Sequence, residues 1–457
     1  MSIDKITATS CIVYPEISTH AHFKPQAQGI LFTQTAPVLR LATDGQDTEA
    51  LMNALVNSST ALFWLKQVSF NKGAGQEEER DRYEFAAGKL RDLPVPASIA
   101  SGLRGKPDAL STTLIRLAKA CSARGEELSS TSVRKLFENK SEAYQKWNQS
   151  LPGYVPPHIG IGVDFVDTKS LHETYDRVKS MRERFRGEMI AFQEEMDWLL
   201  YSAYGLLQGD HTTAQSECES AALDREQRPF HLYAEAQGDF ARAVRSIPNG
   251  WSSPRKKLWE ARLATIRDNE HIRRIEQPVY KRRWDEQWKV GNEWRCGSIA
   301  YAAEFVNAFE WWMVEKAEWW LEHKKNGGPV EFDDWAQALW KDSRVNGAWP
   351  IAAEEYAKLR DDKALQEANK NGEPAPALIT PVRDFVSFRR ELKRIVDEET
   401  VAENIPFAVS YEELEKKLKR KIPGNISKVR GKLNVPRERF HLRDKTQYLW
   451  AGLQFKQ

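Results

Sequence analysis

The chain has 457 residues, of which 41% are hydrophobic and 29% charged; this is ordinary for a globular protein and leaves room for two to four domains. Its formal net charge of +2 excludes a global positive field, so binding to a polyanion must use local clusters of cations. The four cysteines lie far apart and form no CxxC pair, which argues against a zinc site or a disulfide scaffold and favours a reducing cytoplasm. Without an apolar leader or an uncharged apolar stretch of about 18 residues, we expect a soluble protein.

The N-terminal region alternates short β-prone runs with turns and a few helices. The β-prone runs are residues 12–14, 30–32 and 38–41, which Pro and Gly separate. Residues 51–68 predict two helices, the second capped by Ser58 or Ser59. After a polar loop at 73–82 and the extended LPVP at 93–96, a further helix is predicted over 99–120. A mixed domain covering residues 1–165 follows from this pattern.

From about Ser170 the pattern changes to long amphipathic helices. A Pro-rich link at 371–381 then leads to a strongly basic segment. We therefore predict an α+β protein with a helical domain at 166–370 and a C-terminal segment at 371–457. The predicted helices of this part are 171–208, 240–245, 255–268, 298–322, 332–342 and 352–369.

The sequence contains no recognisable catalytic motif. Neither a Gly-rich phosphate loop nor a GxSxG elbow occurs, so no catalytic residue is assigned. His20 and His22 would share a face of a strand; we favour a polar pair in a loop or groove over a metal site, and we include both among the predicted DNA contacts. No metal-binding residue is assigned either.

The helix predicted after Ser59 has an unusual polar exit. Its Leu-Phe-Trp-Leu face suits packing onto a core, whereas Lys66, Gln67, Asn71 and Lys72 are residue types that contact phosphates and base edges. The alternative is a capped helix that ends in a solvated loop.

Two clusters of cations stand out. Residues 416–440 contain a single acid, Glu438, and several turn-forming pairs, which fits phosphate contact better than a salt-bridged helix. A second cluster at 273–284 carries Glu276 as well. The alternative for both is a solvated surface. The cations predicted to contact DNA are Lys281, Arg282, Arg283, Lys421, Lys428, Arg430, Lys432, Arg437 and Arg439.

Several segments in order resemble one family. The chain is similar to the C-terminal half of the large adenine-specific DNA methyltransferases of BREX and DISARM phage-defence systems, relatives of the fused restriction-methylation enzymes. The resemblance is densest at VNSSTALFWLKQVSFNKG and RYEFAAGKL. The other segments are STHAHF at 18–23, TAPV at 35–38, QEEMDW with Tyr201 and Tyr204 to Leu206, IEQPVYKRRW at 275–284, RGKLNVPRERF at 430–440 and WAG at 450–452.

The resemblance implies a target-recognition domain followed by a helical region. The family's Gly-rich S-adenosylmethionine loop and Asn-Pro-Pro-aromatic motif are absent, so we expect no cofactor in this chain and S-adenosylmethionine on a catalytic partner. The expected partners are double-stranded DNA and a methyltransferase catalytic domain or other defence-system subunits, with the chain acting as a separate subunit or persisting as a remnant. The main alternative is a helical scaffold subunit that uses a Trp-rich surface, and a further one is an unrecognised enzyme such as a nuclease.

Overall fold

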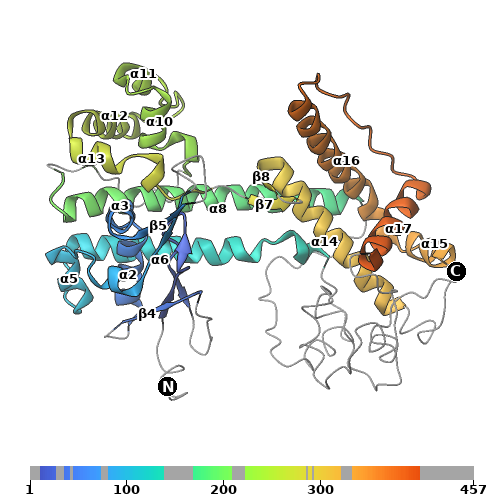
Figure 1. Ribbon diagram of the computed structural model, residues 1–457, viewed down its shortest axis with the longest axis horizontal. Helices are drawn as coiled ribbons and strands as arrows, with labels where there is room; N and C mark the ends of the chain where they lie inside the picture. The colour runs from blue at the N-terminus through green and yellow to red at the C-terminus, as the bar shows by residue number, and fades with distance from the viewer. Residues whose placement is uncertain are drawn as a thin grey trace, which may run out of the picture. The chain divides into compact units, whose positions relative to one another are not determined.

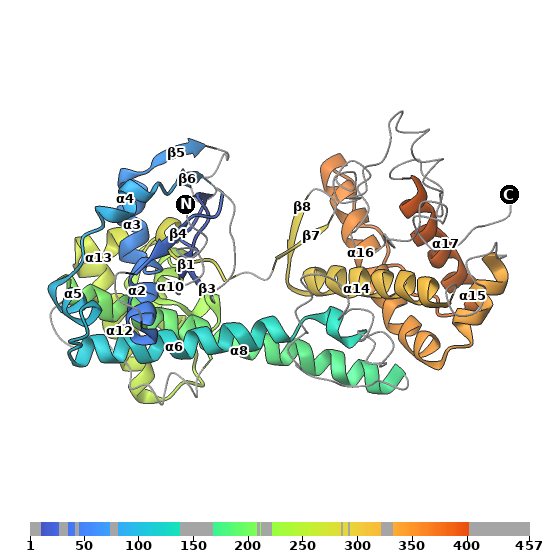
Figure 2. The same ribbon diagram turned by 90° about the horizontal axis from the view of Figure 1, so that it is seen from below.

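The chain folds into two compact units, each assembled from two separate stretches (Figures 1 and 2). The first is Met1–Ser129 with Met181–Trp284, and the second is Ser130–Ser180 with Asp285–Gln457. These units do not follow the predicted boundaries near residues 165 and 370. The computed structural model describes residues 11–26, 35–41, 45–73, 81–137, 168–207, 211, 222–284, 287–290, 293–320 and 332–401.

The first unit contains two small antiparallel sheets. In one, β1 (Cys11–Val13) lies between β3 (Lys24–Gln26) and β4 (Val38–Arg40). Proline is tolerated in β3 because this strand is at the edge of the described sheet. The other sheet has the order β2 (Ile17–Ser18), β6 (Arg82–Glu84), β5 (Phe70–Gly73). The strands predicted near 12–14 and 38–41 are confirmed, whereas residues 30–32 lie outside the described part.

The helices that follow confirm the predicted pair and correct a third. After α2 (Gln46–Val56), α3 (Ser59–Val68) begins at Ser58, whose Oγ accepts a hydrogen bond from the Ala61 N–H at 3.1 Å. A short α4 (Ala87–Arg91) comes next. The single helix predicted over 99–120 is wrong: α5 (Ala97–Leu103) and α6 (Ala109–Ser130) are separated by Gly105, which has a φ of +79°.

The long helix α8 (Thr168–Ala203) organises the first unit. One side of its C-terminal half packs on α2, α3 and α6, and another side packs on the later helices (Figure 1). Those later elements are η3 (Arg225–Gln227), α10 (Pro229–Glu235), α11 (Phe240–Arg245), α12 (Ser253–Asp268), α13 (Glu270–Ile275) and η4 (Pro278–Tyr280).

The second unit is mainly helical, as predicted, with an aromatic core. Phe305, Trp312, Trp335, Trp349 and Phe388 are all buried in it. Its elements are η2 (Val133–Leu136), the hairpin β7 (Gln287–Val290) and β8 (Glu293–Cys296), and the helices α14 (Gly297–Trp320), α15 (Phe332–Trp340), α16 (Ser343–Asn371) and α17 (Phe385–Val401).

Helix α16 begins nine residues before the start predicted from sequence. Pro350 lies inside this helix, although proline is unfavourable there because it lacks the N–H of a helical hydrogen bond. Asp342 caps the helix through the Arg344 and Val345 N–H groups, and buried Trp349 holds the first turns in the core. Tertiary packing thus overrides the local signal. The α+β class itself is confirmed.

Tryptophan is a core residue here. None of the ten Trp side chains that the structure describes is exposed, since each is either buried or half-buried. The described surface therefore offers no Trp-rich face of the kind that the scaffold alternative requires. Separately, none of the described helices combines the length and apolar content needed to cross a membrane.

Candidate nucleic-acid interface

Three sets of residues predicted to contact DNA come together in the first unit: the histidines near residue 20, the end of α3 and the cations at 281–283. The Lys66 ammonium at the end of α3 donates to the Val279 carbonyl at 2.8 Å, and the Gln67 amide donates to the Tyr280 hydroxyl at 3.2 Å. The charges of Lys66 and Arg283 both act on His20, and that of Arg282 acts on His22. Residues more than 200 positions apart in sequence are thus neighbours. We call His22, Gln67, Tyr280, Arg282 and Arg283 the basic patch.

The sequence of α3 explains this placement. Leu62 and Leu65 are buried in the core, which fixes the rotation of the helix. On another side, the Phe63 ring meets the Tyr280 ring edge to face, with centroids 4.9 Å apart. The last turn of α3 therefore lies against the segment that follows η4.

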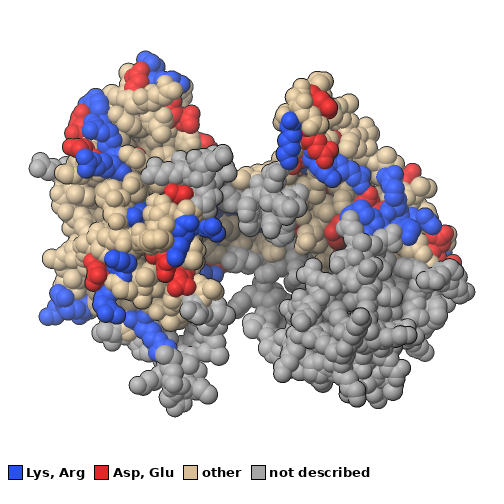
Figure 3. All heavy atoms as spheres, viewed as in Figure 1, with Lys and Arg blue, Asp and Glu red and all other residues tan. Residues whose placement is uncertain are grey.

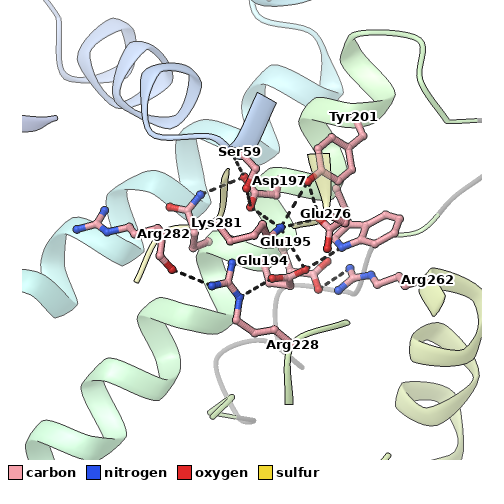
Figure 4. A network of polar contacts seen from close by, with 12 residues as sticks. Ser59, Glu194, Glu195, Asp197, Tyr201, Arg228, Arg262, Glu276, Lys281 and Arg282 are labelled. Atoms are coloured by element: carbon pink, nitrogen blue, oxygen red, sulfur yellow. Dashed lines mark hydrogen bonds and ion pairs between the residues drawn. The ribbon is translucent and has the colours of Figure 1, made fainter. Parts of the chain in front are cut away.

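Behind the patch lies a buried network of charged residues, shown in Figure 4. At its centre the Lys281 ammonium lies 2.6 Å from Glu276 Oε1, 3.0 Å from Asp197 Oδ2 and 3.8 Å from Glu194 Oε1. The Tyr201 hydroxyl also donates to Glu276 Oε1 at 2.5 Å. Lys281 is 1% exposed, so these contacts replace its water shell.

Carboxylates on α8 extend the network to three other elements. Asp197 accepts from the Ser59 N–H at 2.8 Å and from the Ser59 hydroxyl at 2.6 Å, which anchors the N-terminus of α3 where helix polarity favours an anion. Glu194 accepts from Arg228 Nε at 2.9 Å. Arg228 in turn donates through Nη1 to the Arg282 carbonyl at 2.9 Å. The backbone that carries the patch is therefore tied to α8.

A further buried ion pair connects the network to α12. Arg262 Nη2 lies 2.7 Å from Glu195 Oε1 and 2.8 Å from the His211 carbonyl oxygen. Both side chains of this pair are buried. The acids of α8 thereby reach α3, α10, α12 and the segment after η4.

The charges in this network are set by their neighbours. Burial alone would raise the pKa of Glu194, but Lys281, Arg228 and Arg262 outweigh burial and hold the pKa at about 2. Burial also raises the pKa of Glu276, and Lys281 offsets this only in part. For Lys281, burial favours the neutral amine, yet the three carboxylates raise the pKa above its ordinary value. Lys281 is therefore a permanent buried cation.

Two of the cations predicted to contact DNA need correction, as does a third predicted contact, the buried His20. Lys281 is enclosed by carboxylates, and Lys66 is 6% exposed, donates to Val279 and lies 5.0 Å from the Tyr83 ring centroid. Their ammonium groups are used inside the protein, so in this fold they have no surface for a phosphate. We remove both from the predicted interface and assign them a structural role.

Arg282 lies in a different environment from Lys281. The backbone is extended at Lys281 (φ −99°, ψ 135°), so neighbouring side chains point to opposite sides. Figure 4 shows Lys281 pointing into the network and Arg282 pointing away from it. The half-buried Arg282 guanidinium stacks on Trp284, 4.4 Å from the ring centroid, and pairs with no carboxylate among the described residues. Arg283 is also half-buried.

The two histidines differ in exposure but not in charge. The His22 side chain is exposed, yet desolvation and the charge of Arg282 lower its pKa to about 4, so it is neutral at pH 7. His20 is buried, its Nδ1 lies 3.0 Å from Thr19 Oγ1, and burial together with the charges of Lys66 and Arg283 lowers its pKa to about 3. His20 is therefore neutral at pH 7. Among the described residues, no group of three or more His, Cys, Asp and Glu side chains is arranged to hold a metal ion.

The remaining predicted residues lie elsewhere. Asn71 and Lys72 are exposed on β5, where Asn71 Nδ2 donates to Asp81 at 2.8 Å and Lys72 pairs with Glu84 at 2.6 Å. No hydrogen bond or ion pair joins them to the basic patch in the described part of the chain. The cations of the tail fall outside the described residues: Lys421, Lys428, Arg430, Lys432, Arg437 and Arg439.

Sequence reasoning missed Tyr280 and the acids of the network. A signal for the acids existed: Glu194, Glu195 and Asp197 lie in a stretch of α8 with apolar residues on every side. Acids in a helix that is buried all round require buried partners. Nothing in the sequence identified those partners.

Comparison with known proteins places the chain near one enzyme. Residues 189–369 match a family model described as a domain of unknown function, DUF7008. The chain is 27% identical to the adenine-specific methyltransferase PglX of Streptomyces coelicolor, over 95% of this chain. The match covers 35% of that protein, so the chain spans about a third of its length. No solved structure matches the chain.

Proposed function

We propose that this chain contacts double-stranded DNA through the basic patch, as the DNA-recognition part of a phage-defence adenine methyltransferase. The similarity to an adenine-specific methyltransferase over 95% of the chain supports the enzyme class. The observation that carries the DNA contact is Arg282, a half-buried cation with no carboxylate partner among the described residues, next to Arg283 and the exposed His22.

The chemistry of the patch suits a duplex. An arginine fork binds a phosphate or the edge of a guanine, and a glutamine amide can pair with an adenine edge. Gln67 is already oriented by the Tyr280 hydroxyl. The buried network fixes the backbone beneath Arg282 through Arg228, so little order has to be gained on binding.

Methyl transfer would take place outside these 457 residues. The relative is about three times as long as the matched portion, and we place S-adenosylmethionine binding and catalysis on a methyltransferase catalytic domain that acts together with this chain. Other subunits of the defence system are the further proposed partners. Purified alone, the chain should not methylate DNA.

The test compares duplex binding by two variants that remove the same charge. Binding is measured by fluorescence anisotropy. Arg282→Ala with Arg283→Ala should lower the slope of log affinity against log salt by up to about 1.8, which is about 0.9 for each phosphate that the variant no longer neutralises. The control removes two cations that already have carboxylate partners, Lys119→Ala with Arg274→Ala. Equal effects of the two variants, or no binding by the wild type, would contradict the proposal.

A further inference from the structure

A second group of cations occupies the junction of α11 and α12. Residues 240–259 contain no Asp or Glu. We call the following residues the α11–α12 surface: Arg242, Arg245, Trp251, Arg255, Lys256 and Lys257. Figure 3 shows Lys and Arg side chains at the end of the first unit that carries α11, with acidic side chains beside them. This concentration contrasts with the nearly neutral charge of the whole chain.

Three cations of this surface, all exposed, lack the carboxylate partners that other surface cations of the unit have among the described residues. Arg242, Arg245 and Lys257 are exposed, and none of them pairs with an acid among the described residues. By contrast, Arg274 pairs with Glu270 at 2.5 Å and Lys119 pairs with Asp47 at 2.5 Å. Exposed cations that form no ion pair within the protein can bind an anionic ligand.

The position of three of the cations strengthens this point. Arg255, Lys256 and Lys257 lie in the first turn or so of α12, and no acid occupies that turn. The positive end of a helix disfavours cations and favours anions, by roughly 0.3–1 kcal/mol for each charge. Ser252 caps the helix through the Arg255 N–H. The sequence thus places positive charge at a helix end where negative charge would be more stabilising. An anionic ligand bound at this surface would offset that cost.

The scaffold beneath these cations is packed into a core. Helices α11 and α12 share the core in which Ala243, Trp259 and Leu263 are buried. The Trp251 ring packs edge to face on Trp259, with centroids 5.1 Å apart, and the Arg255 guanidinium stacks on Trp251 at 3.9 Å. Lys256 is held by the Asn249 carbonyl at 2.7 Å. Cations on the ends of two packed helices suit contact with a polyanion.

We propose that the α11–α12 surface is a second nucleic-acid contact, which binds the phosphate backbone of the duplex without reading its sequence. The inference rests on the proposed function for the identity of the ligand, but it uses none of the residues of the basic patch. Phosphates carry no sequence information, so removing these cations should weaken binding to every duplex alike.

The experiment is a salt titration with two fluorescein-labelled duplexes of unrelated sequence. Arg242→Ala, Arg245→Ala and Lys257→Ala are combined in one variant, and the control combines Lys119→Ala, Arg225→Ala and Arg274→Ala, which removes the same charge from ion-paired positions. The α11–α12 variant should lower the salt slope by up to about 2.7 for both duplexes, and the control should leave it unchanged. Thermal melting checks that both variants fold.

The outcomes separate this inference from the proposed function. An unchanged slope in the α11–α12 variant, with a reduced slope in the Arg282→Ala, Arg283→Ala variant, overturns the second contact alone. A reduced slope in the α11–α12 variant, with an unchanged slope in the Arg282→Ala, Arg283→Ala variant, supports the second contact and overturns the DNA-binding role of the basic patch. A variant that loses binding to poly-glutamate while it binds DNA normally would assign the surface to an acidic protein, which also overturns the inference. No duplex binding by the wild type overturns both.

Discussion

Lys281 and Arg282 are neighbours in the chain and have opposite environments. Lys281 is buried among three carboxylates, whereas Arg282 points away from them and stacks on Trp284. The extended backbone at Lys281 separates them, because it sends alternate side chains to opposite sides. A run of cations therefore contains two kinds of residue. One kind holds the unit together, and the other remains available for a ligand.

The largest expected effect comes from the buried member of this pair. Lys281→Met removes the cation but leaves Glu194, Asp197 and Glu276 buried, and it should lower the free energy of unfolding by about 3–5 kcal/mol. Adding Asp197→Asn and Glu276→Gln should recover part of this loss, because two of the uncompensated charges are then gone. Urea unfolding of the three proteins checks this. A loss below 1 kcal/mol would show that the network contributes little.

The next effect is a dependence of stability on pH. The pKa of His20 is lowered to about 3 in the folded chain, whereas an ordinary histidine has a pKa near 6.5. Between these values the unfolded chain binds a proton that the folded chain does not, so stability falls as the pH is lowered. Between pH 6.5 and 5, wild type should lose about 1.6 kcal/mol more than His20→Gln. Parallel loss in the two proteins would contradict the low pKa.

A smaller effect is expected at the sheet. Lys72 forms an ion pair with Glu84 in which both side chains are about a third exposed. Such exposed pairs contribute only about 0–1 kcal/mol to stability. Lys72→Ala should therefore unfold close to wild type, and any effect on duplex affinity would come from a direct contact. A change of more than 2 kcal/mol in unfolding would assign Lys72 a structural role instead.

Local chemistry made parts of the fold predictable. The start of α3 was predictable at Ser58 or Ser59, because a hydroxyl side chain before an apolar run favours a helix N-cap. The strand at residues 11–13 was visible in its β-branched residues. The early start of α16 was not predictable in this way: the local cost of Pro350 is outweighed by the burial of Trp349, which depends on residues far away in sequence.

The candidate site was predictable in composition but not in arrangement. His22, Gln67 and Arg282 could be identified by residue type, since each is suited to nucleic-acid contact. Their proximity depends on the packing of α3 against the segment after η4, through Phe63 and Tyr280. The opposite error concerned Lys66 and Lys281, because a charge in a sequence does not reveal whether carboxylates from another helix enclose it.

The contrast between Lys281 and Arg282 can be measured directly in a single variant. Arg282→Ala keeps the backbone carbonyl that Arg228 contacts and loses only the stack on Trp284, so it should unfold within about 1 kcal/mol of wild type, while the salt slope of duplex binding falls by about 0.9. Both quantities are measured on the same preparation, by urea unfolding and by fluorescence anisotropy. Normal stability with a reduced slope is the predicted result. Wild-type duplex binding by Arg282→Ala, at every salt concentration, would contradict a DNA-binding role for the patch.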